Sequence, residues 1–440
     1  MKYVELIKSI ILTFLVLLSV SLTMIIWSYE PEYEFLEEPE VQQMAIGTEK
    51  ELRDIIRPYK ALYRQDNELH GSVSVVALEQ SMDLLTAMDI GNIRIAKENA
   101  TPQSMNKLMN EDNQIMLLFN TDVPLETLNE ALKLNQNDIE NMQFDRIIIN
   151  TQNLRATQAI ELRFINTKAN VIYRAAATVD NVKELNENIK AQMENAFEYE
   201  EFTRDGELSY YLPHHNTDAF QFTYFTDETQ QELLTGALFT DSPILQKNVE
   251  GNLEKYDDGM SLMTFDTSLK IMDYENPSAE NSTIIAPGKL VNDTFNSIND
   301  HGGFNADFRL SSVDHVQKSA EFQLFFQGYP VYSTTTLTRI VTTWGDNRLV
   351  RYRRPYYELQ TDITTVKTSQ QLANGQQVIE QLDNQIANTN SIDDLVIGYF
   401  LIQDQNTRLF VLEPSWFAMS GNSWTRITLL PEGSVADGLE

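Results

Sequence analysis

Three short motifs containing serine and lysine occur in the order found in penicillin-binding proteins. Ser104 and Lys107 match S-x-x-K, residues 297–299 match S-x-N, and residues 367–369 approximate K-T-G. In such enzymes the serine attacks an acyl carbonyl, and a lysine one helical turn away accepts its proton. The third motif needs a glycine where this sequence has Ser369, and S-x-x-K arises by chance about once in a chain of this length. The motifs therefore do not predict an acyl-transferring enzyme.

Metal chemistry has few candidate ligands in this sequence. The chain contains no cysteine and five histidines, none of which forms H-E-x-x-H. The histidines are His70, His214, His215, His301 and His315. His214 and His215 lie in a polar segment before Asp218, where an adjacent pair is more often solvated than bound to metal. The sequence thus predicts no metal site and no cofactor.

Other catalytic signatures are absent or uninformative. The sequence has no G-x-S-x-G elbow, no phosphate-binding loop and no dinucleotide-binding fingerprint. Its 64 Asp and Glu residues could include the paired acids of a glycosidase, but carboxylates are so frequent that their spacing carries no signal. The residues alone therefore neither show nor exclude a glycosidase.

One cluster of positive charge lies on an expected strand near the C-terminal end. Its members are Arg348, Arg351, Arg353 and Arg354, beside Tyr352, Tyr356 and Tyr357. Arg351 and Arg353 share a strand face because side chains alternate. The cluster could dock an acidic partner or a wall polymer. Alternatively, it is a solvated strand whose arginines pair with neighbouring acids, which is the commoner arrangement.

A membrane span is predicted at residues 9–29, which carry no charge. As a helix, these residues extend roughly 31 Å, about one hydrocarbon core. Trp27 and Tyr29 fall where aromatic rings favour the interface. Lysines precede the span and six glutamates follow it before Val41, so we expect a cytoplasmic tail at residues 1–8 and an extracytoplasmic bulk.

A cleaved signal peptide is the alternative interpretation of this segment. Residues 19–21 form a small-x-small triplet, but the apolar run continues beyond it for too long to be a cleavage region. We therefore expect a retained anchor. With so short a tail inside the cell, any signal across the membrane must pass through the helix.

One face of the predicted span could contact another membrane helix. Ser19 and Thr23 are four residues apart, with Leu15 and Ile26 nearby on the same face. Small polar residues at this spacing allow helices to approach closely. Isolated serine and threonine are also tolerated in any span, so both interpretations stay open.

Composition limits the remaining function classes. The chain has 440 residues, and its apolar fraction of 42% is enough for each of two to four domains to bury a core. Without cysteine, large cores must stabilise the fold in place of disulfides, a usage common on Gram-positive cell surfaces. A formal charge of −31 repels phosphate backbones, so nucleic acid is not an expected partner.

The part after the span is expected to be α+β, in about three mixed domains. Residues 30–43 form an acidic linker, followed by predicted domains at residues 44–205, 206–312 and 313–440. The last two each show a hairpin, a helix and a hairpin, which could reflect duplication. Helices are expected at residues 75–90, 227–239, 287–301 and 370–384, and hairpins at residues 261–274, 338–356 and 395–412.

Several segments together resemble the YycH family of Gram-positive regulators. The anchor with Trp27, Tyr29 and Pro31 is similar to theirs, as are GYPVY at residues 328–332, WGDNRLVRYRRPYYEL at residues 344–359 and VLEPSWF at residues 411–417. The resemblance covers the whole chain in order and length. No single motif is diagnostic, and the resemblance rests on their combination.

The resemblance implies a role and partners. Family members sit beside an essential sensor histidine kinase of the YycG/WalK type, which controls cell-wall metabolism, and act with a single-span sibling, YycI. Their final domain is similar to the YycI fold, and their contacts with the kinase run largely through membrane helices. The family has no catalytic residues, and its effect on the kinase is inhibition in some bacteria and activation in others, so the sign here is open.

Three function classes follow for testing. The chain is expected to be a non-enzymatic regulator of a membrane kinase; the alternatives are a surface-anchored enzyme acting on the cell wall and a wall-polymer-binding module. A regulator that acts through its span should lose function when an unrelated span replaces residues 9–29. An enzyme or binding module needs only a tether.

Overall fold

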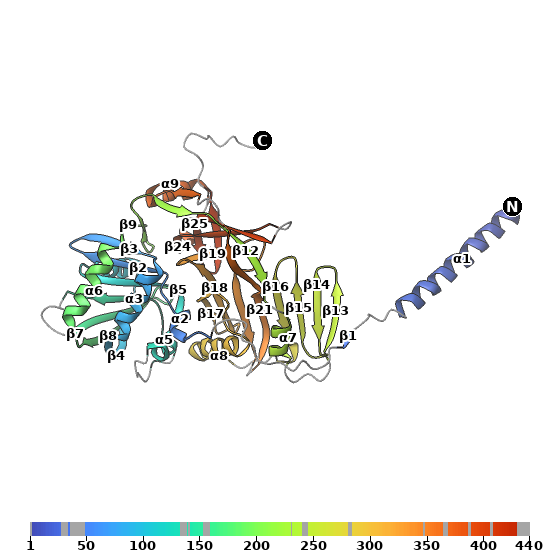
Figure 1. Cartoon of the computed structure of the whole chain (residues 1–440), viewed down its shortest axis with the longest axis horizontal. Coiled ribbons are helices and arrows are strands. Elements are labelled where there is room, and N and C mark those ends of the chain that lie inside the picture. Colours follow the sequence, from blue (N-terminus) through green and yellow to red (C-terminus); the bar gives the residue numbers. More distant parts are fainter. Residues whose placement is uncertain are drawn as a thin grey trace.

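The computed structural model describes residues 2–27, 34–35, 49–132, 139, 141–152, 159–229, 231–239, 245–279, 284–345, 348–363, 368–385, 389–404 and 408–428 (Figure 1). Strands dominate and mix with helices, which confirms the predicted α+β class. The helices are α1 (Lys2–Trp27), α2 (Leu52–Ile55), α3 (Val75–Thr86), α4 (Pro102–Met109), α5 (Leu125–Leu132), α6 (Val182–Glu194), α7 (Gln231–Leu238), α8 (Pro287–Asp300) and α9 (Gly375–Gln385).

An N-terminal lobe, residues 59–213, is built on one antiparallel sheet, and residues 49–58 lead into it. In the described residues this sheet has the order β10-β9-β3-β2-β5-β6-β7-β8-β4. Its strands are β2 (Lys60–Gln65), β3 (Glu68–Ser72), β4 (Met88–Lys97), β5 (Gln114–Pro124), β6 (Gln143–Asn150), β7 (Ala159–Asn166), β8 (Val171–Val179), β9 (Phe197–Phe202) and β10 (Tyr210–Pro213).

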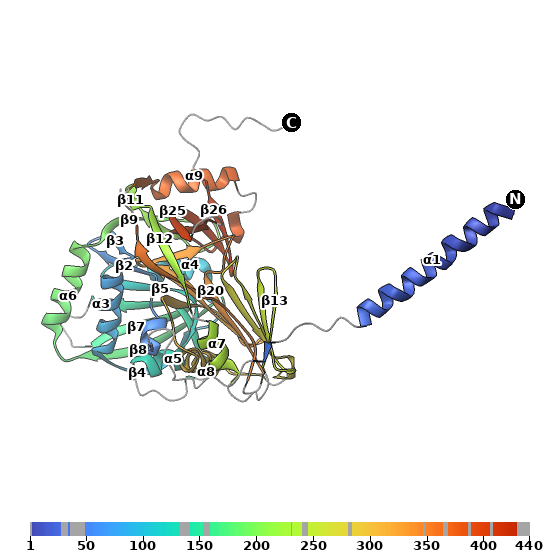
Figure 2. The same cartoon turned by 45° about the vertical axis from the view of Figure 1, so that its right-hand side comes forward.

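Both faces of this sheet are covered, because its central strands are apolar without alternation. On β6, Ile147, Ile148 and Ile149 are all fully buried. Ile147 and Ile149 pack in one core with side chains of α3 and α6, whereas Ile148 packs in another with Met105 of α4. Figure 2 shows α3 and α6 on the outer side of the lobe. The inner face is therefore left for α4 and the second lobe.

A C-terminal lobe, residues 217–428, carries a long, strongly bent sheet. Its order is β1-β13-β14-β15-β16-β21-β20-β18-β19-β24-β25-β12-β22, with β17 on β18 and β26 on β25. The pairs are antiparallel except for β19 with β24. A separate pair joins β11 to β23.

The strands of the C-terminal lobe include many short hairpins. They are β11 (Thr217–Phe220), β12 (Phe222–Glu228), β13 (Gln246–Glu250), β14 (Leu253–Asp257), β15 (Leu262–Asp266), β16 (Ile271–Glu275), β17 (Asp307–Asp314), β18 (Ser319–Phe326), β19 (Tyr329–Tyr332), β20 (Arg339–Trp344), β21 (Leu349–Pro355), β22 (Tyr357–Asp362), β23 (Ser369–Leu372), β24 (Asp394–Gln403), β25 (Leu409–Ser420) and β26 (Ser423–Ile427). The short strand β1 (Glu34–Phe35) adds to the free edge of β13.

The structure has the order hairpin, helix and hairpin twice, but its first instance extends past the predicted division at 312, and the duplication stays a prediction. It runs β15-β16, α8, β17-β18 and then β20-β21, α9, β24-β25. The ends of α8 follow from its sequence. Pro287 occupies the first turn, and Gly302 and Gly303 adopt positive φ just after the helix, where other residues are strained.

Three expected helices have different bounds in the structure. Residues 88–90 belong to β4, residues 227–228 belong to β12, and residues 369–372 form β23 instead of the start of α9. Each of these segments pairs with a strand distant in the sequence; β23, for example, pairs with β11. Helical periodicity in a short window contains no information about such a partner. The helix prediction is therefore wrong for these segments, because strand pairing determines their conformation.

The predicted domain divisions fall close to, or within, strands. The division at 205–206 lies between the paired strands β9 and β10, and position 312 lies inside β17. Strands from both sides of position 312 share the long sheet, since β16 pairs with β21.

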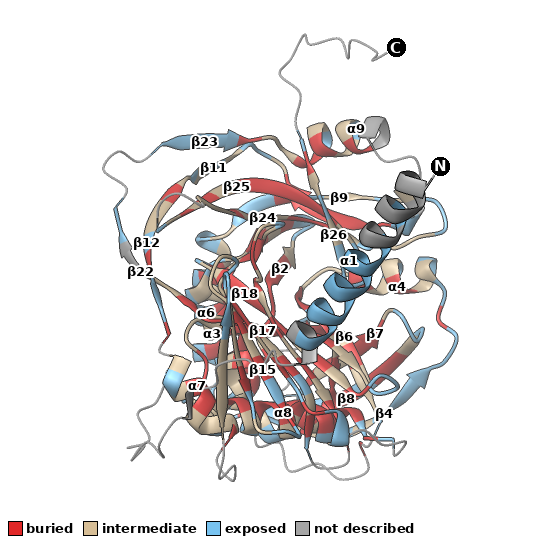
Figure 3. Cartoon of the chain, turned by 90° about the vertical axis from the view of Figure 1, so that its right-hand side faces the viewer, coloured by how far each residue is buried: buried red, intermediate tan, exposed pale blue. Residues whose placement is uncertain are grey.

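The two lobes share a buried core. Leu62 and Met116 of the first sheet pack in one apolar cluster with Phe325, Tyr332 and Phe417 of the second. Figure 3 shows buried residues continuing through the body. We call this junction the seam.

Helix α1 lies apart from the body in Figures 1 and 2. Leu12, Phe14 and Met24 are more than 60% exposed, at 64%, 64% and 70%. Within the part of the chain that the structure describes, no helix has both the length and the apolar character needed to cross a membrane. Residues 28–29 of the predicted span, and almost all of the predicted linker at residues 30–43, lie outside the described residues.

Candidate functional site

The helix face predicted for membrane contacts lies on α1. Leu15 and Ser19 are exposed, and the Thr23 hydroxyl donates a hydrogen bond to the carbonyl oxygen of Ser19 at 2.8 Å. This bond within the helix satisfies the hydroxyl proton and leaves the oxygen able to accept from a neighbouring helix. The side chain of Ile26 is not among those described. The proposed contact face stays a prediction.

The predicted arginine cluster lies on β21, where two members meet acids of β16. Arg351 donates to both carboxylate oxygens of Asp273 at 3.0 and 2.6 Å and lies 3.4 Å from Glu275. Arg353 lies on the same face, 3.7 Å from Asp273. Arg348 is exposed at the start of the strand. The face is thus a mixed-charge surface, and its use as a docking patch stays a prediction.

Arg354 does not belong to that surface, which corrects the predicted cluster. Only 1% of it is exposed. Its guanidinium donates to the carbonyl oxygen of Gly303 at 3.2 Å, to the Tyr352 hydroxyl at 2.9 Å and to Asn305 Oδ1 at 3.2 Å. Successive strand residues point to opposite faces, so Arg354 faces the core while Arg353 faces solvent.

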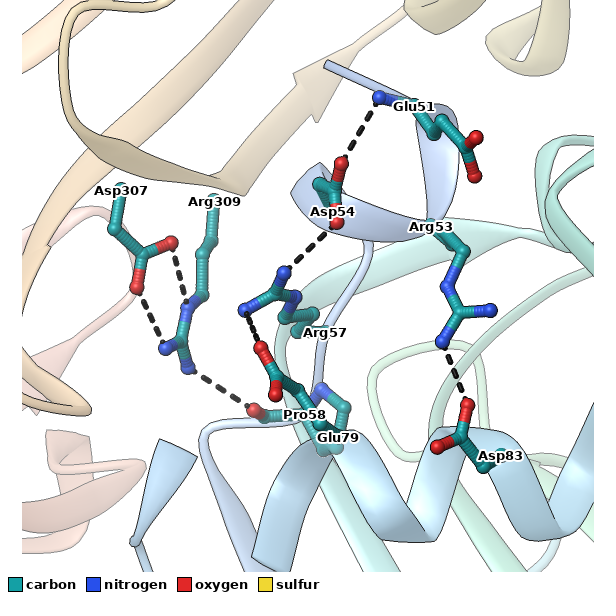
Figure 4. Close-up of polar contacts among 9 residues, drawn as sticks. All are labelled: Glu51, Arg53, Asp54, Arg57, Pro58, Glu79, Asp83, Asp307 and Arg309. Carbon is teal, nitrogen blue, oxygen red and sulfur yellow. Dashed lines mark hydrogen bonds and ion pairs between the residues drawn. The ribbon is translucent and has the colours of Figure 1, made fainter. Parts of the chain in front are cut away.

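The structure reveals a second feature, a bridging segment at residues 49–58 that contacts both lobes (Figure 4). Toward the N-terminal lobe, Arg53 pairs with Asp83 of α3 at 2.7 Å, and Arg57 pairs with Glu79 of α3 at 3.0 Å. These pairs fix the short helix α2 beside α3. The bridging segment is therefore attached to the N-terminal lobe by ion pairs of its two arginines.

Toward the C-terminal lobe, the bridging segment contacts α8 and β17. Asn299 of α8 exchanges two hydrogen bonds with the backbone of Lys50, at 3.3 and 3.0 Å. Arg309 of β17 is fully buried and donates to the Pro58 carbonyl oxygen at 3.3 Å and to Asp307 at 3.3 and 2.8 Å (Figure 4). One short segment thus contacts both lobes, by ion pairs with the N-terminal lobe and by hydrogen bonds of its backbone with the C-terminal lobe.

A second charged contact at the seam joins Asp394 of the C-terminal lobe to Tyr59 and Lys60. Asp394 of β24 accepts a hydrogen bond from the Tyr59 hydroxyl, and its Oδ2 lies 3.4 Å from Lys60 Nζ. Lys60 also donates to the Tyr211 carbonyl oxygen at 3.2 Å. Burial lowers the pKa of Lys60 and raises the pKa of Tyr59. A lysine with a lowered pKa can act as a nucleophile, but this amine is buried and held on two acceptors, so its role is structural.

A cavity of about 330 Å³ lies in the seam, lined by both lobes. Its walls include Arg146 and Asp122 from one lobe and Arg339 and Trp424 from the other. Among the described buried atoms, Arg146 Nε and Asp122 Oδ1 have no hydrogen-bond partner. Burial raises the pKa of Asp122. Such mixed polar walls suit a small polar ligand better than an apolar one.

The serine motifs do not form a catalytic group in the described residues. The Ser104 hydroxyl donates to the Thr101 carbonyl oxygen at 2.9 Å, within the cap of α4. Ser297 lies 3.1 Å from His301 Nδ1 at the end of α8. Lys367 lies outside the described residues. The hydroxyls of Ser104 and Ser297 thus bind groups of their own helices.

Gly328 of the C-terminal lobe lies close to the backbone of Val73 in the N-terminal lobe. It has φ +87°, and a Cβ there would lie 2.3 Å from the Val73 carbonyl oxygen. We expect Gly328→Ala to destabilise the fold by about 2 kcal/mol more than Gly251→Ala, since overpacking costs roughly 1–3 kcal/mol. Gly251 is the control because it also has positive φ, +63°, with open space around it. Urea unfolding measures the free energy of unfolding of both variants. Equal destabilisation would show that the backbone at the seam moves to accommodate a Cβ at Gly328.

Comparison with known proteins agrees with this architecture. A family model described as "YycH protein, N-terminal domain" matches residues 5–194, and one described as "YycH protein, C-terminal domain" matches residues 207–434. The chain is 23% identical over 458 residues to "Two-component system WalR/WalK regulatory protein YycH" of Bacillus subtilis (strain 168), covering 99% of each chain. Its fold resembles the crystal structure of YycH from Bacillus subtilis, with a TM-score of 0.74 and 19% identity, covering 87% of this chain and 98% of that chain. Because the two family models match in order and extend over both lobes, the chain belongs to the YycH family.

Proposed function

We propose that this protein is an accessory regulator of a two-component system of the WalR/WalK kind, with no catalytic activity of its own. The observation that carries the proposal is the match of both YycH domain models along one chain. The relative named as a WalR/WalK regulatory protein is similar over 99% of both chains. The serine motifs, whose hydroxyls are used in helix ends, give no support for an enzyme.

We further propose that residues 9–29 anchor the protein in the cell membrane, with the amino terminus in the cytoplasm. The uncharged sequence and the flanking charges support this orientation. In the structure these residues up to Trp27 belong to one continuous helix, and its described apolar side chains from Leu12 to Met24 are exposed. An exposed apolar surface of this kind favours lipid or a partner over water.

The partners in this proposal are a sensor histidine kinase and a YycI-like single-span protein, and the contact is made by membrane helices. A helix that binds one state of a two-state kinase more tightly can shift its equilibrium, typically by 1–3 kcal/mol. The regulated process would be cell-wall metabolism.

The bridging segment supports a connection between the anchor and both lobes. The chain leaving α1 joins the C-terminal lobe through β1, which pairs with β13, and then enters residues 49–58, which contact both lobes. A rearrangement at the seam would therefore change where the bridging segment lies. In this mechanism, the movement reaches the membrane helix and alters its packing on the kinase.

The helix face is tested by replacing Ser19 and Thr23 with leucine in the full-length protein. We expect about 1 kcal/mol weaker association, or roughly fivefold less kinase recovered by co-purification from mild detergent. The larger side chains prevent close approach of a partner helix. The matched control, Thr13→Leu with Ser21→Leu, makes the same chemical changes on the opposite face. Equal recovery from both double variants would remove the Ser19 face from the account.

A further inference from the structure

The two adjacent histidines are brought against acids of a neighbouring strand. His214 and His215 directly follow β10, which pairs with β9, and the His214 amide donates to the Glu198 carbonyl oxygen at 2.9 Å. His215 Nε2 then lies 3.2 Å from a Glu198 carboxylate oxygen. His214 Nδ1 lies 3.0 Å from a carboxylate oxygen of Glu200. Strand pairing therefore places two imidazoles and two carboxylates together.

Three of these residues have the arrangement of metal ligands. Glu198, His214 and His215 each offer one donor atom, and the three atoms lie within 4.8 Å of one another. The two imidazole rings are 4.7 Å apart between centroids. Zinc holds imidazole nitrogen and carboxylate oxygen at about 2.0–2.2 Å, which puts donors about 3.3–3.6 Å apart in a tetrahedron. Small side-chain rotations would bring the set to that spacing.

The surroundings permit such a rotation. The side chains of His215 and Glu198 are 74% and 56% exposed, so neither is held by packing. Exposed pairs of this type stabilise a fold by about 0–1 kcal/mol, so little is lost when an ion replaces their mutual contact. Glu200 beside His214 raises the pKa of that imidazole through a hydrogen bond. Carboxylates hold and polarise zinc-binding histidines in the same way.

We propose that Glu198, His214 and His215 form a zinc site, with Glu200 orienting His214. Three protein ligands leave a fourth position for water or for an anionic group of a ligand. Glu198 and His215 also line a second seam cavity of about 250 Å³, whose other wall includes Tyr329 and Pro330 of the C-terminal lobe. A bound ion would stand at the edge of this cavity. The site is independent of the proposed regulatory function.

Calorimetric titration of the full-length, metal-free protein in detergent with zinc chloride tests the site. The protein must carry no histidine tag. We expect one zinc ion per chain, and roughly tenfold or weaker affinity in His214→Ala, His215→Ala and Glu198→Gln. Glu198→Gln retains the shape of the side chain while weakening the ligand. His315→Ala is the matched control, because this histidine is exposed and lies outside the cluster.

The titrations distinguish a zinc site from a pair of exposed histidines that only contact acids. Unchanged affinity in His315→Ala together with the loss in the three cluster variants supports the site. Absence of zinc binding in the wild type, or equal affinity in wild type and His214→Ala/His215→Ala, overturns it. Kinase co-purification from the same preparations reports on the regulatory proposal separately, so either can fail alone.

Discussion

Replacing Asp307 with alanine is expected to destabilise the folded protein by about 3–5 kcal/mol, because it leaves Arg309 as a buried charge without its carboxylate. Arg309 is fully buried, and its guanidinium lies over the Phe325 ring at 4.2 Å from the centroid. Its other contact is the Pro58 carbonyl oxygen at 3.3 Å. A carbonyl oxygen carries no net charge. Without Asp307, the desolvation penalty of the buried guanidinium is therefore no longer offset by a carboxylate. Urea unfolding followed by circular dichroism measures the change.

Two further variants make this result specific to burial. Asp83→Ala removes the partner of Arg53 in an exposed pair, and it should cost less than about 1 kcal/mol. The double variant Asp307→Ala/Arg309→Met removes both charges and should recover most of the stability. If Asp307→Ala unfolds at the same urea concentration as Asp83→Ala, Arg309 is not a buried anchor of the bridging segment.

The local parts of this fold could be predicted from the sequence. The hairpin β15-β16, the cap at Thr101 and the ends of α8 follow from turn and capping residues within a few positions. The segment at residues 369–372 shows the limit, since its strand state depends on pairing with β11 at residues 217–220, far earlier in the chain. No pattern inside the segment encodes that partner.

The seam could not be predicted for the same reason. Arg309 and Pro58 lie 251 positions apart, and Lys60 and Asp394 lie 334 apart. A single lysine or arginine in a strand is typical of a surface, and only packing of the two lobes makes these charges buried. The residues of the proposed zinc site could be predicted in part. The adjacent histidines can be recognised in the sequence, whereas Glu198 cannot be linked to them from the sequence alone. The pairing of β9 with β10 supplies the missing acid.

The arrangement of the arginines on β21 could be predicted only in part. Alternation correctly placed Arg351 and Arg353 on one face. The same rule assigns Arg354 to the other face, where it binds the Gly303 carbonyl oxygen inside the core. Which face is buried depends on the helix α8 and the loop that follows it, and this could not be read from the strand alone.

Replacing the predicted span is the change with the largest expected effect on function. If the regulator acts through membrane-helix contacts, an unrelated span in place of residues 9–29 should abolish association with the kinase while leaving both lobes folded. The lobes are built from residues 49–428 and do not need the identity of the span for their described contacts. A cell-wall enzyme or a wall-polymer-binding module would retain its activity, because it requires only attachment.

Co-purification with these two spans tests the central claim most directly. The native and span-replaced proteins are extracted from membranes in mild detergent, with and without cross-linking, and the proteins recovered with each are identified. The account predicts a sensor histidine kinase and a second single-span protein with the native span alone. Recovery of neither protein with either span, even after cross-linking, would contradict the regulatory account.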